Sequence, residues 1–219
     1  MRSVPSDRHA RARIRDSALE LFGARGIAAT SIRAIAAHAG VSPALVIHHF
    51  ESKEGLQRAC DDYVLGELMG RNAQALDDAD LSGTIQHWIA DMDTFRPAFD
   101  YLARMITEAT DDGLRLWDGL VDRTEAMIAD GVTAGVMRPS TDAHMRAVIV
   151  AAYGLVPLIL ERHIGRALGE SGLTTDAVRR MTLPTIELYT HGLYTDDTTL
   201  AAAQAALDTP TPPDKENHS

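Results

Sequence analysis

Apolar residues recur at helical spacing along the chain, and this pattern predicts a protein built almost entirely from α-helices. Near the start, Ile14, Ala18, Leu21 and Phe22 stand at i, i+4, i+7 and i+8, so they form one apolar helix face. Gly23 is the first of two glycines expected to end this helix. No run alternates apolar and polar residues as a half-buried strand would. The predicted fold class is therefore all-α.

Residues 31–50, SIRAIAAHAGVSPALVIHHF, predict two short helices joined by a tight turn. Helices that cross at close range need a small side chain at the contact, which Ala36 supplies. The turn needs a residue that tolerates a positive φ, which Gly40 supplies. Val46 would anchor the second helix inward, and Ser42 stands where it can cap that helix. This spacing is typical of a helix-turn-helix.

Longer helical segments are expected in the rest of the chain, and Ser52 can cap the first of them. The predicted ranges are 53–76, 84–94, 97–109, 114–135, 142–165, 175–193 and a weak helix over 198–207. Pro157 and Pro184 are expected to bend or begin the helices that contain them. The predicted organisation is an N-terminal arm and helix-turn-helix domain over 1–52, a helical domain over 53–207 and a disordered tail over 208–219.

The charge is distributed unevenly along the chain. The formal net charge is -10, yet the first 60 residues hold nine Lys and Arg against five Asp and Glu, which gives +4. The remaining residues hold twelve against 26, which gives -14. A cationic first quarter can present a local attractive surface to a polyanion. The acidic total therefore does not exclude nucleic acid as a partner.

Several functional classes lack a sequence signal. The start, MRSVPSDRHARARIRD, has no apolar stretch after it, and the longest uncharged apolar run, 147–160, is shorter than the roughly 20 residues of a membrane span. Cys60 is the single cysteine, which fits a reducing compartment. We therefore expect a cytoplasmic protein that does not bind membranes. Glu187 and His191 have i, i+4 spacing without a third ligand, so no metal is expected.

Motifs of catalysis are also missing from the sequence. It contains no GxSxG, HExxH, GxxxxGK[ST] or GxGxxG pattern, and most carboxylates fall on predicted solvent faces or in loops. We therefore expect neither an enzyme nor a cofactor.

The run from Arg13 to Leu56 contains TSIRAIAAHAGVS, a short helix ending in HHF, and ESKEGL, and it resembles the N-terminal DNA-binding domain of the TetR family of transcriptional regulators. The later segments AVIVAAYGLVPLILERH and MTLPTIELYTHGLY are similar to the family's ligand-binding and dimerisation domain. The resemblance implies a repressor that binds a palindromic double-stranded operator as a homodimer and is relieved by a small-molecule effector. The alternative is an all-helical protein-interaction module without specific DNA binding.

Carried over residue by residue, the resemblance implies a set of DNA contacts. Arg33 suits a guanine edge, whereas hydroxyl, imidazole and ammonium groups suit phosphate oxygens. Arg8, Arg11 and Arg13 would form a flexible basic arm. One departure is Ile47, which stands where the family usually has tyrosine. The implied DNA-binding residues are Ser31, Arg33, Ser42, Ala44, Leu45, His48, His49 and Lys53.

Large side chains of the second domain are candidates for lining a ligand cavity, although side chains spaced in this way on amphipathic helices are more often plain core. The candidates are Trp88, Phe95, Phe99, Met105, Trp117, Met127 and Tyr153. Segments 142–165 and 175–193 are expected to form the dimer interface as a four-helix bundle, with Leu155 and Ile159 inside it. The helix over 53–76 belongs to both domains and would act as the lever between ligand and DNA.

Overall fold

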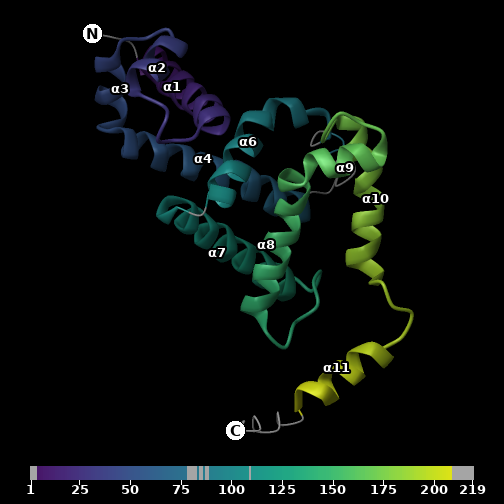
Figure 1. Ribbon diagram of the computed structural model, residues 1–219. Helices are drawn as coiled ribbons and strands as arrows, with labels where there is room; N and C mark the ends of the chain where they lie inside the picture. The colour runs from purple at the N-terminus through teal and green to yellow at the C-terminus, as the bar shows by residue number, and fades with distance from the viewer. Residues whose placement is uncertain (1–3, 78–82, 84–85, 87–88, 109, 209–219) are drawn as a thin grey trace, which may run out of the picture. The chain divides into compact units, whose positions relative to one another are not determined.

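The computed structural model describes residues 4–77, 83, 86, 89–108 and 110–208, and within these ranges its regular structure is entirely α-helical (Figure 1). The predicted all-α fold class is therefore confirmed. Two compact units are present, Met1–Ala177 and Val178–Ser219. The predicted tail lies outside the described residues from position 209 on, and so do positions 84, 85, 87 and 88 of the predicted helix over 84–94.

Three helices gather at one end of the first unit (Figure 1), and their apolar faces meet in a small core. Phe22, Ile35, Val46 and Phe50 are each at most 5% exposed. Gly40 has φ +65 in the turn between the second and third helices, as the pattern predicted. The three helices are α1 (Val4–Arg25), α2 (Ile32–His38) and α3 (Pro43–Phe50).

The predicted flexible arm is wrong, because α1 begins at Val4 and contains Arg8, Arg11 and Arg13. The local chemistry favours this outcome. Pro5 lies in the first turn, where its missing N–H is not needed, and alanine and arginine are among the strongest helix formers. The buried side chain of Ala10 adds a tertiary contact.

The helices that follow complete the first unit. Helix α1 lies along α6, while α4 packs on α7 and α7 on α8. Leu56, Val64, Tyr101, Leu102 and Leu116 are almost completely buried and belong to the same core as the helix-turn-helix. The predicted division after residue 52 stays a prediction. The helices are α4 (Lys53–Asp77), α6 (Met92–Glu108), α7 (Asp111–Thr133), α8 (Ala143–Ile159) and α9 (Glu161–Leu168).

The segment predicted as one helix over 142–165 is broken at Leu160, where α8 and α9 meet at a bend of 68°. Pro157 is the physical cause that the sequence offers, because it removes one N–H from the last turn of α8. Within the described residues, no single helix has both the length and the apolar character needed to cross a membrane, although this bent pair together has them.

Leu155 points into the core of its own chain and is 4% exposed, so its assignment to the dimer interface is wrong. Ile159 is 40% exposed. The reason is rotation about the helix axis, since residues four apart share a face and Ala147, Ala151 and Leu155 are all buried. The second unit contains most of α10 (Thr175–His191) and α11 (Thr198–Asp208).

Candidate DNA-binding surface

Three serines fix where the helices of this surface begin. The Oγ of Ser31 accepts the Ala34 N–H at 3.1 Å, and the Oγ of Ser42 accepts the Leu45 N–H at 3.2 Å. Ser52 caps α4 in the same way through the Gly55 N–H at 3.0 Å. Each is an N-cap that satisfies an amide at a helix start. A hydroxyl that accepts one bond keeps its own hydrogen to donate, so the exposed Ser31 and Ser42 can also bind an anionic oxygen.

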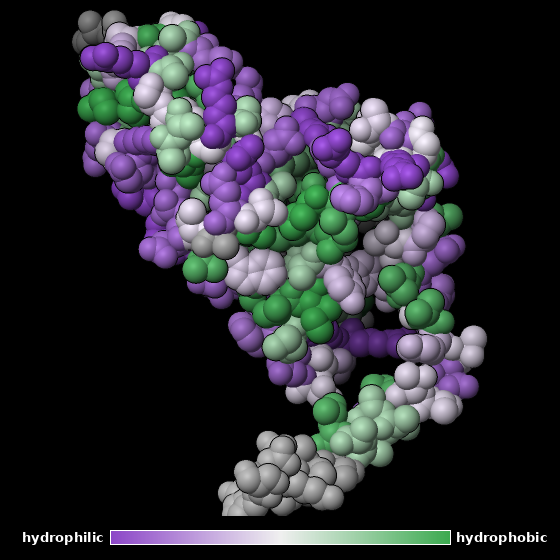
Figure 2. All heavy atoms as spheres, in the orientation of Figure 1, coloured by the Kyte–Doolittle hydropathy of each residue, from purple (hydrophilic) through white to green (hydrophobic). Residues whose placement is uncertain are grey.

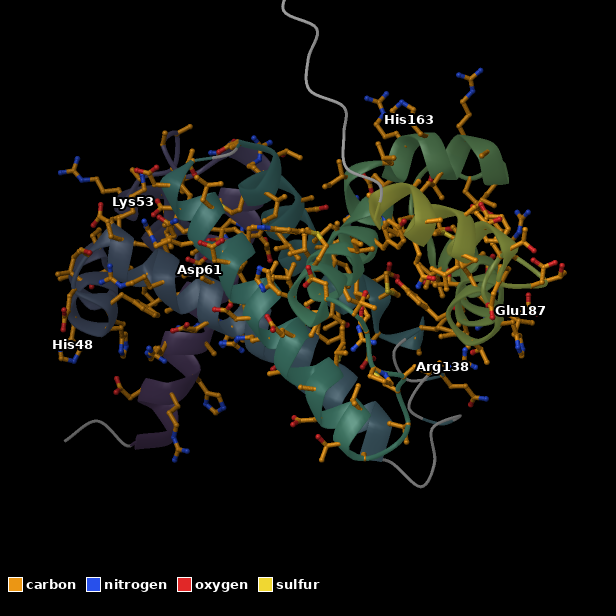
Figure 3. All side chains as sticks on the ribbon, turned by 90° about the horizontal axis from the view of Figure 1, so that it is seen from below. His48, Lys53, Asp61, Arg138, His163 and Glu187 are labelled. Atoms are coloured by element: carbon orange, nitrogen blue, oxygen red, sulfur yellow. The ribbon has the colours of Figure 1, made fainter. Side chains whose placement is uncertain are left out.

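Helix α3 divides into an inner and an outer face. Val46 and Phe50 are buried on the inner face. Ala44 and His48 are exposed on the opposite face, and Leu45 is half-buried between the two faces. Figure 3 shows His48 and the start of α4 at Lys53 at the same end of the ribbon. Ala44, Leu45 and His48 are therefore accessible on α3, and their contact with DNA stays a prediction.

His49 is turned inward, which corrects the expectation that it contacts DNA. Only 6% of its side chain is exposed, and its Nε2 lies 3.5 Å from Oδ1 of Asp7 on α1. That nitrogen is buried and has no hydrogen-bond partner among the described residues, because this separation lacks hydrogen-bond geometry. The imidazole therefore packs between α3 and the first turns of α1. The sequence could not distinguish the two adjacent histidines, since the packing of α1 decides between them.

Basic side chains surround the outer face of α3. Arg33 is exposed in the first turn of α2, and Lys53 is half-buried at the first residue of α4. The guanidinium of Arg11 stands 5.1 Å from the ring centroid of Phe50, a cation–π contact between α1 and α3. Arg13 and the outer face of α3 line one open groove. Arg11 and Arg13 of α1 therefore lie beside α3.

The candidate ligand site is small in this structure. Phe99 is the one candidate residue that lines the cavity beside α6, α8 and α9, whose volume is about 20 Å³, enough for a water molecule. The Phe95 and Phe99 rings pack at 6.3 Å between centroids and fill neighbouring space. The cavity is lined by Met92, Asp93, Arg96, Phe99, Asp100, Leu158, Glu161 and Leu173.

The other ligand candidates are distributed over the core and the surface. Met105 is 1% exposed and belongs to the core, while Trp117 and Met127 pack against that core half-buried. Tyr153 is 58% exposed on α8 and does not line the cavity beside α6, so its contact with a ligand stays a prediction. Trp88 lies outside the described residues.

An ion-pair cluster occupies one wall of the cavity. Arg96 donates from Nη2 to Oε2 of Glu161 at 2.6 Å and contacts Oδ1 of Asp100 at 2.9 Å. Burial alone would lower the pKa of Arg96, but these two carboxylates outweigh it and raise the pKa.

Across the described ranges, no group of three or more His, Cys, Asp or Glu side chains is arranged to hold a metal ion.

Sequence analysis missed a buried polar contact between α4 and α6. The hydroxyl of Tyr101, a residue with no exposed surface, donates to Oδ1 of Asp61 at 2.5 Å. Burial raises the pKa of Asp61 to about 6, although the Tyr101 hydrogen bond acts in the opposite direction. The available sequence signal was a carboxylate next to Cys60 and three residues before Val64, which are both buried. This contact ties the helix that begins at the DNA-binding surface to α6.

Comparison with known proteins gives matches over both halves of the chain. Residues 14–60 match the family described as bacterial regulatory proteins, tetR family, and residues 93–195 match the tetracyclin repressor-like C-terminal domain. The HTH-type transcriptional regulatory protein RaaS from Mycobacterium tuberculosis is 39% identical over 198 residues, which cover 90% of this chain and 91% of that protein. An HTH-type transcriptional repressor from the same organism is 32% identical over 70% of this chain and 73% of its own length.

Two solved structures share the fold. The TetR family transcriptional regulator PfmR from Thermus thermophilus has a TM-score of 0.55 and 22% identity, with 85% of this chain and 98% of that chain covered. The regulator FadR from Bacillus subtilis, solved in complex with stearoyl-CoA, has a TM-score of 0.53 and 15% identity, with 84% and 99% covered.

Proposed function

This chain belongs to the tetR family of bacterial regulatory proteins, and from that premise we propose that it is a homodimeric repressor that binds a two-fold symmetric operator and is released by a small molecule. It is a DNA-binding transcriptional regulator and not an enzyme. The observation that carries the proposal is the exposed outer face of α3 with Arg33 and Lys53 beside it. We place the protein in the cytoplasm, where operator DNA is accessible.

We assign the DNA contacts to two classes. Arg33 is exposed at the start of α2, and a guanidinium can form two hydrogen bonds with a guanine edge. Ser31, Ser42, His48 and Lys53 contact phosphates, which position α3 without reading sequence. Ala44 and Leu45 contact the groove itself. His49 is left out of this set because its ring packs against α1.

Dimerisation is supported by an apolar stripe on α8. The residues of the stripe follow one another at intervals of three or four along the sequence. Each has a large apolar side chain that is at least 40% exposed. Figure 2 shows apolar side chains gathered over this helix. A surface of this kind is typical of a protein–protein interface. The stripe consists of Met145, Ile149, Tyr153, Val156 and Leu160.

A dimer explains how a helix as short as α3 can be specific. Two copies related by a two-fold axis read two half-sites about 34–36 Å apart, so the symmetry of the operator follows that of the protein. Helix α10, in the second unit, also exposes large apolar residues, including Leu183 and Ile186. We propose that it contributes to the same interface.

Release by a small molecule is supported by the C-terminal match and by FadR, which was solved with stearoyl-CoA bound. A ligand can weaken DNA binding only if it binds two arrangements of the protein unequally, and operator DNA must then weaken ligand binding by the same factor. The helix α4 is suited to carry this coupling, because Lys53 begins it and Asp61 contacts α6. The chemistry of the effector is left to experiment.

To test the proposed function, genomic fragments that the full chain binds are first selected. The affinity of the full chain for these fragments and for random DNA is then measured at several salt concentrations. We expect Arg33→Ala to lower the preference for selected over random DNA by about 1–3 kcal/mol. Lys53→Ala should weaken both alike and reduce the salt slope by about one unit. A protein indifferent to both DNA and salt would instead support an all-helical interaction module.

A further inference from the structure

We infer that α3 recognises thymine methyl groups in the major groove through an exposed apolar patch made of Pro43, Ala44 and Ile47. The inference rests on the proposed function, since it specifies what the recognition helix reads in the operator. All three residues of the apolar patch are exposed, and Ile47 is 44% exposed. None of them packs in the core, because Val46 and Phe50 form the inner face of α3.

The position of the patch on α3 is the first part of the argument. In a helix-turn-helix, the N-terminal residues of the second helix contact base edges. Pro43 and Ala44 form the first turn of α3, and Ile47 follows Ala44 by three residues, so the two lie on adjacent parts of one surface. The patch therefore occupies the part of α3 that reaches deepest into the groove.

The second part is the lack of hydrogen-bonding alternatives on this helix. The sequence of α3 is PALVIHHF, without the Arg, Lys, Asn, Gln, Asp or Glu side chains that form paired hydrogen bonds with bases. Ser42 is the N-cap that precedes α3 and is assigned to a phosphate, and His49 is turned toward Asp7. His48 is the one polar side chain of α3 that remains on the outer face. Direct reading by α3 is therefore chiefly apolar.

The chemistry of the base pairs then selects one partner. In the major groove, the C5 methyl of thymine is the apolar group that distinguishes one base from the other three. Guanine, adenine and cytosine would instead place polar edge groups against the patch, where they lose water without gaining a hydrogen bond. Discrimination thus comes both from contact with the methyl group and from rejection of unpaired polar edges.

Charges at the border of the patch support DNA as its occupant. Arg33 and Lys53 lie on the helices before and after α3, and Arg13 lines the same groove as Ala44. Cations at these positions attract phosphates and hold an apolar surface against the groove. A hydrophobic protein partner would gain nothing from this arrangement of positive charge.

The test begins with selection of sites from a random duplex library by the full chain. Each enriched thymine is then replaced singly by deoxyuridine, which removes only the methyl group, and Kd is measured at one salt concentration. We expect about a fourfold loss of affinity at each contacted thymine, the equivalent of one buried methyl group. If uracil is tolerated at every enriched thymine, the inference is overturned.

Protein variants locate the reading surface. In Ile47→Ala and Ala44→Gly, the uracil penalty should disappear at the thymine that each residue contacts, so that a double-mutant cycle shows coupling. The control is Leu114→Ala, which trims an aliphatic side chain that is 53% exposed on α7, and it should keep the full uracil penalty. A penalty that persists in both patch variants overturns the assignment to the patch.

Failure of the inference can be separated from failure of the proposed function. If the library yields no enriched sequence, specific operator binding itself is refuted. If it yields enriched sequences whose thymine methyl groups are irrelevant, the protein is a specific DNA-binding regulator that reads bases by another route.

Discussion

Arg104 of α6 donates a hydrogen bond from Nε to the main-chain carbonyl of Gly23 in the last turn of α1, at 2.6 Å. Its Nη2 reaches the next carbonyl, that of Ala24, at 3.3 Å. The last carbonyls of a helix lack partners within it and carry partial negative charge, so a guanidinium there satisfies both needs. Glu108 holds the same guanidinium through Nη1 at 2.9 Å. Helix α6 is therefore attached to the DNA-binding helices through the end of α1.

Loss of the guanidinium should weaken this attachment. Arg104→Met keeps much of the aliphatic stem but leaves the two carbonyls without their charged donor. We expect the free energy of unfolding, measured by urea denaturation, to fall by about 1–2 kcal/mol. The control is Arg115→Met, because Arg115 pairs with Asp112 on the surface of α7 and its side chain is 69% exposed. Arg115→Met should lower the free energy of unfolding by less than about 1 kcal/mol. Equal decreases in the two variants would contradict the role of Arg104 in attaching α6 to α1.

The close approach of α1 to α6 gives a second prediction. A Cβ on Gly23 would lie 3.0 Å from the backbone nitrogen of Tyr101 and 3.3 Å from the backbone carbon of Asp100. Gly23→Ala should therefore push the two helices apart and destabilise the protein by about 1–3 kcal/mol. In Gly66→Ala on α4 the new methyl group meets open space, so helix propensity should stabilise the protein by about 0.5–1 kcal/mol. Thermal melts of both variants measure the difference, and a shared sign would refute the prediction.

Stability should depend on the protonation of Asp61. Burial raises its pKa in the folded protein to about 6, whereas the pKa of an aspartate in the unfolded chain is about 3.9. The folded state thus holds the proton more tightly, and its stability contribution is full below the unfolded pKa and is lost as pH rises through 6. Asp61→Asn cannot titrate, so its stability relative to wild type should increase by about 1–2 kcal/mol from pH 4 to pH 7 after allowance for solvent screening.

The pH prediction depends on the groups around Asp61. The neighbouring Asp62 raises the pKa of Asp61 further, while the positive charge of Arg115 lowers it. Urea denaturation at each pH should therefore be compared between wild type and Asp61→Asn, since the difference cancels most other titrating groups. A constant difference across this range would show that Asp61 titrates as an ordinary surface carboxyl.

Two positions on α8 separate dimerisation from folding. Ile149 is 45% exposed within the apolar stripe, so Ile149→Glu should yield folded monomers with weak operator binding. Leu155 is 4% exposed, and Leu155→Glu places a charge in the core, so it should destabilise the chain itself. Sedimentation and circular dichroism distinguish the two outcomes. A dimeric Ile149→Glu protein would remove α8 from the interface.

Sequence patterns predicted the features that depend on neighbours along the chain. The predicted caps at Ser42 and Ser52 each bind an amide three residues away, and Gly40 takes the positive φ that a short turn needs. Amphipathic spacing likewise predicted helices through most of the described residues. Helix propensity by itself favours a helical start for α1, because alanine and arginine recur there, whereas the flexible arm was a wrong prediction.

Features that depend on distant partners were missed. Arg104 and Gly23 are 81 residues apart, so no local pattern pairs them. The same holds for Asp61 and Tyr101, which are 40 residues apart. Leu155 was assigned to the wrong face because a helix that is apolar on several sides does not show which side its own core will cover.

The helical start of α1 changes what happens when the protein reaches its operator. Arg8, Arg11 and Arg13 already stand on a formed helix, so the entropy of ordering their backbone is lost during folding and not at the moment of binding. We therefore expect association to resemble the docking of two rigid bodies, without the slow step or the large negative heat capacity change that accompanies a segment folding on DNA. The protein should therefore meet DNA with the backbone of these three arginines already ordered.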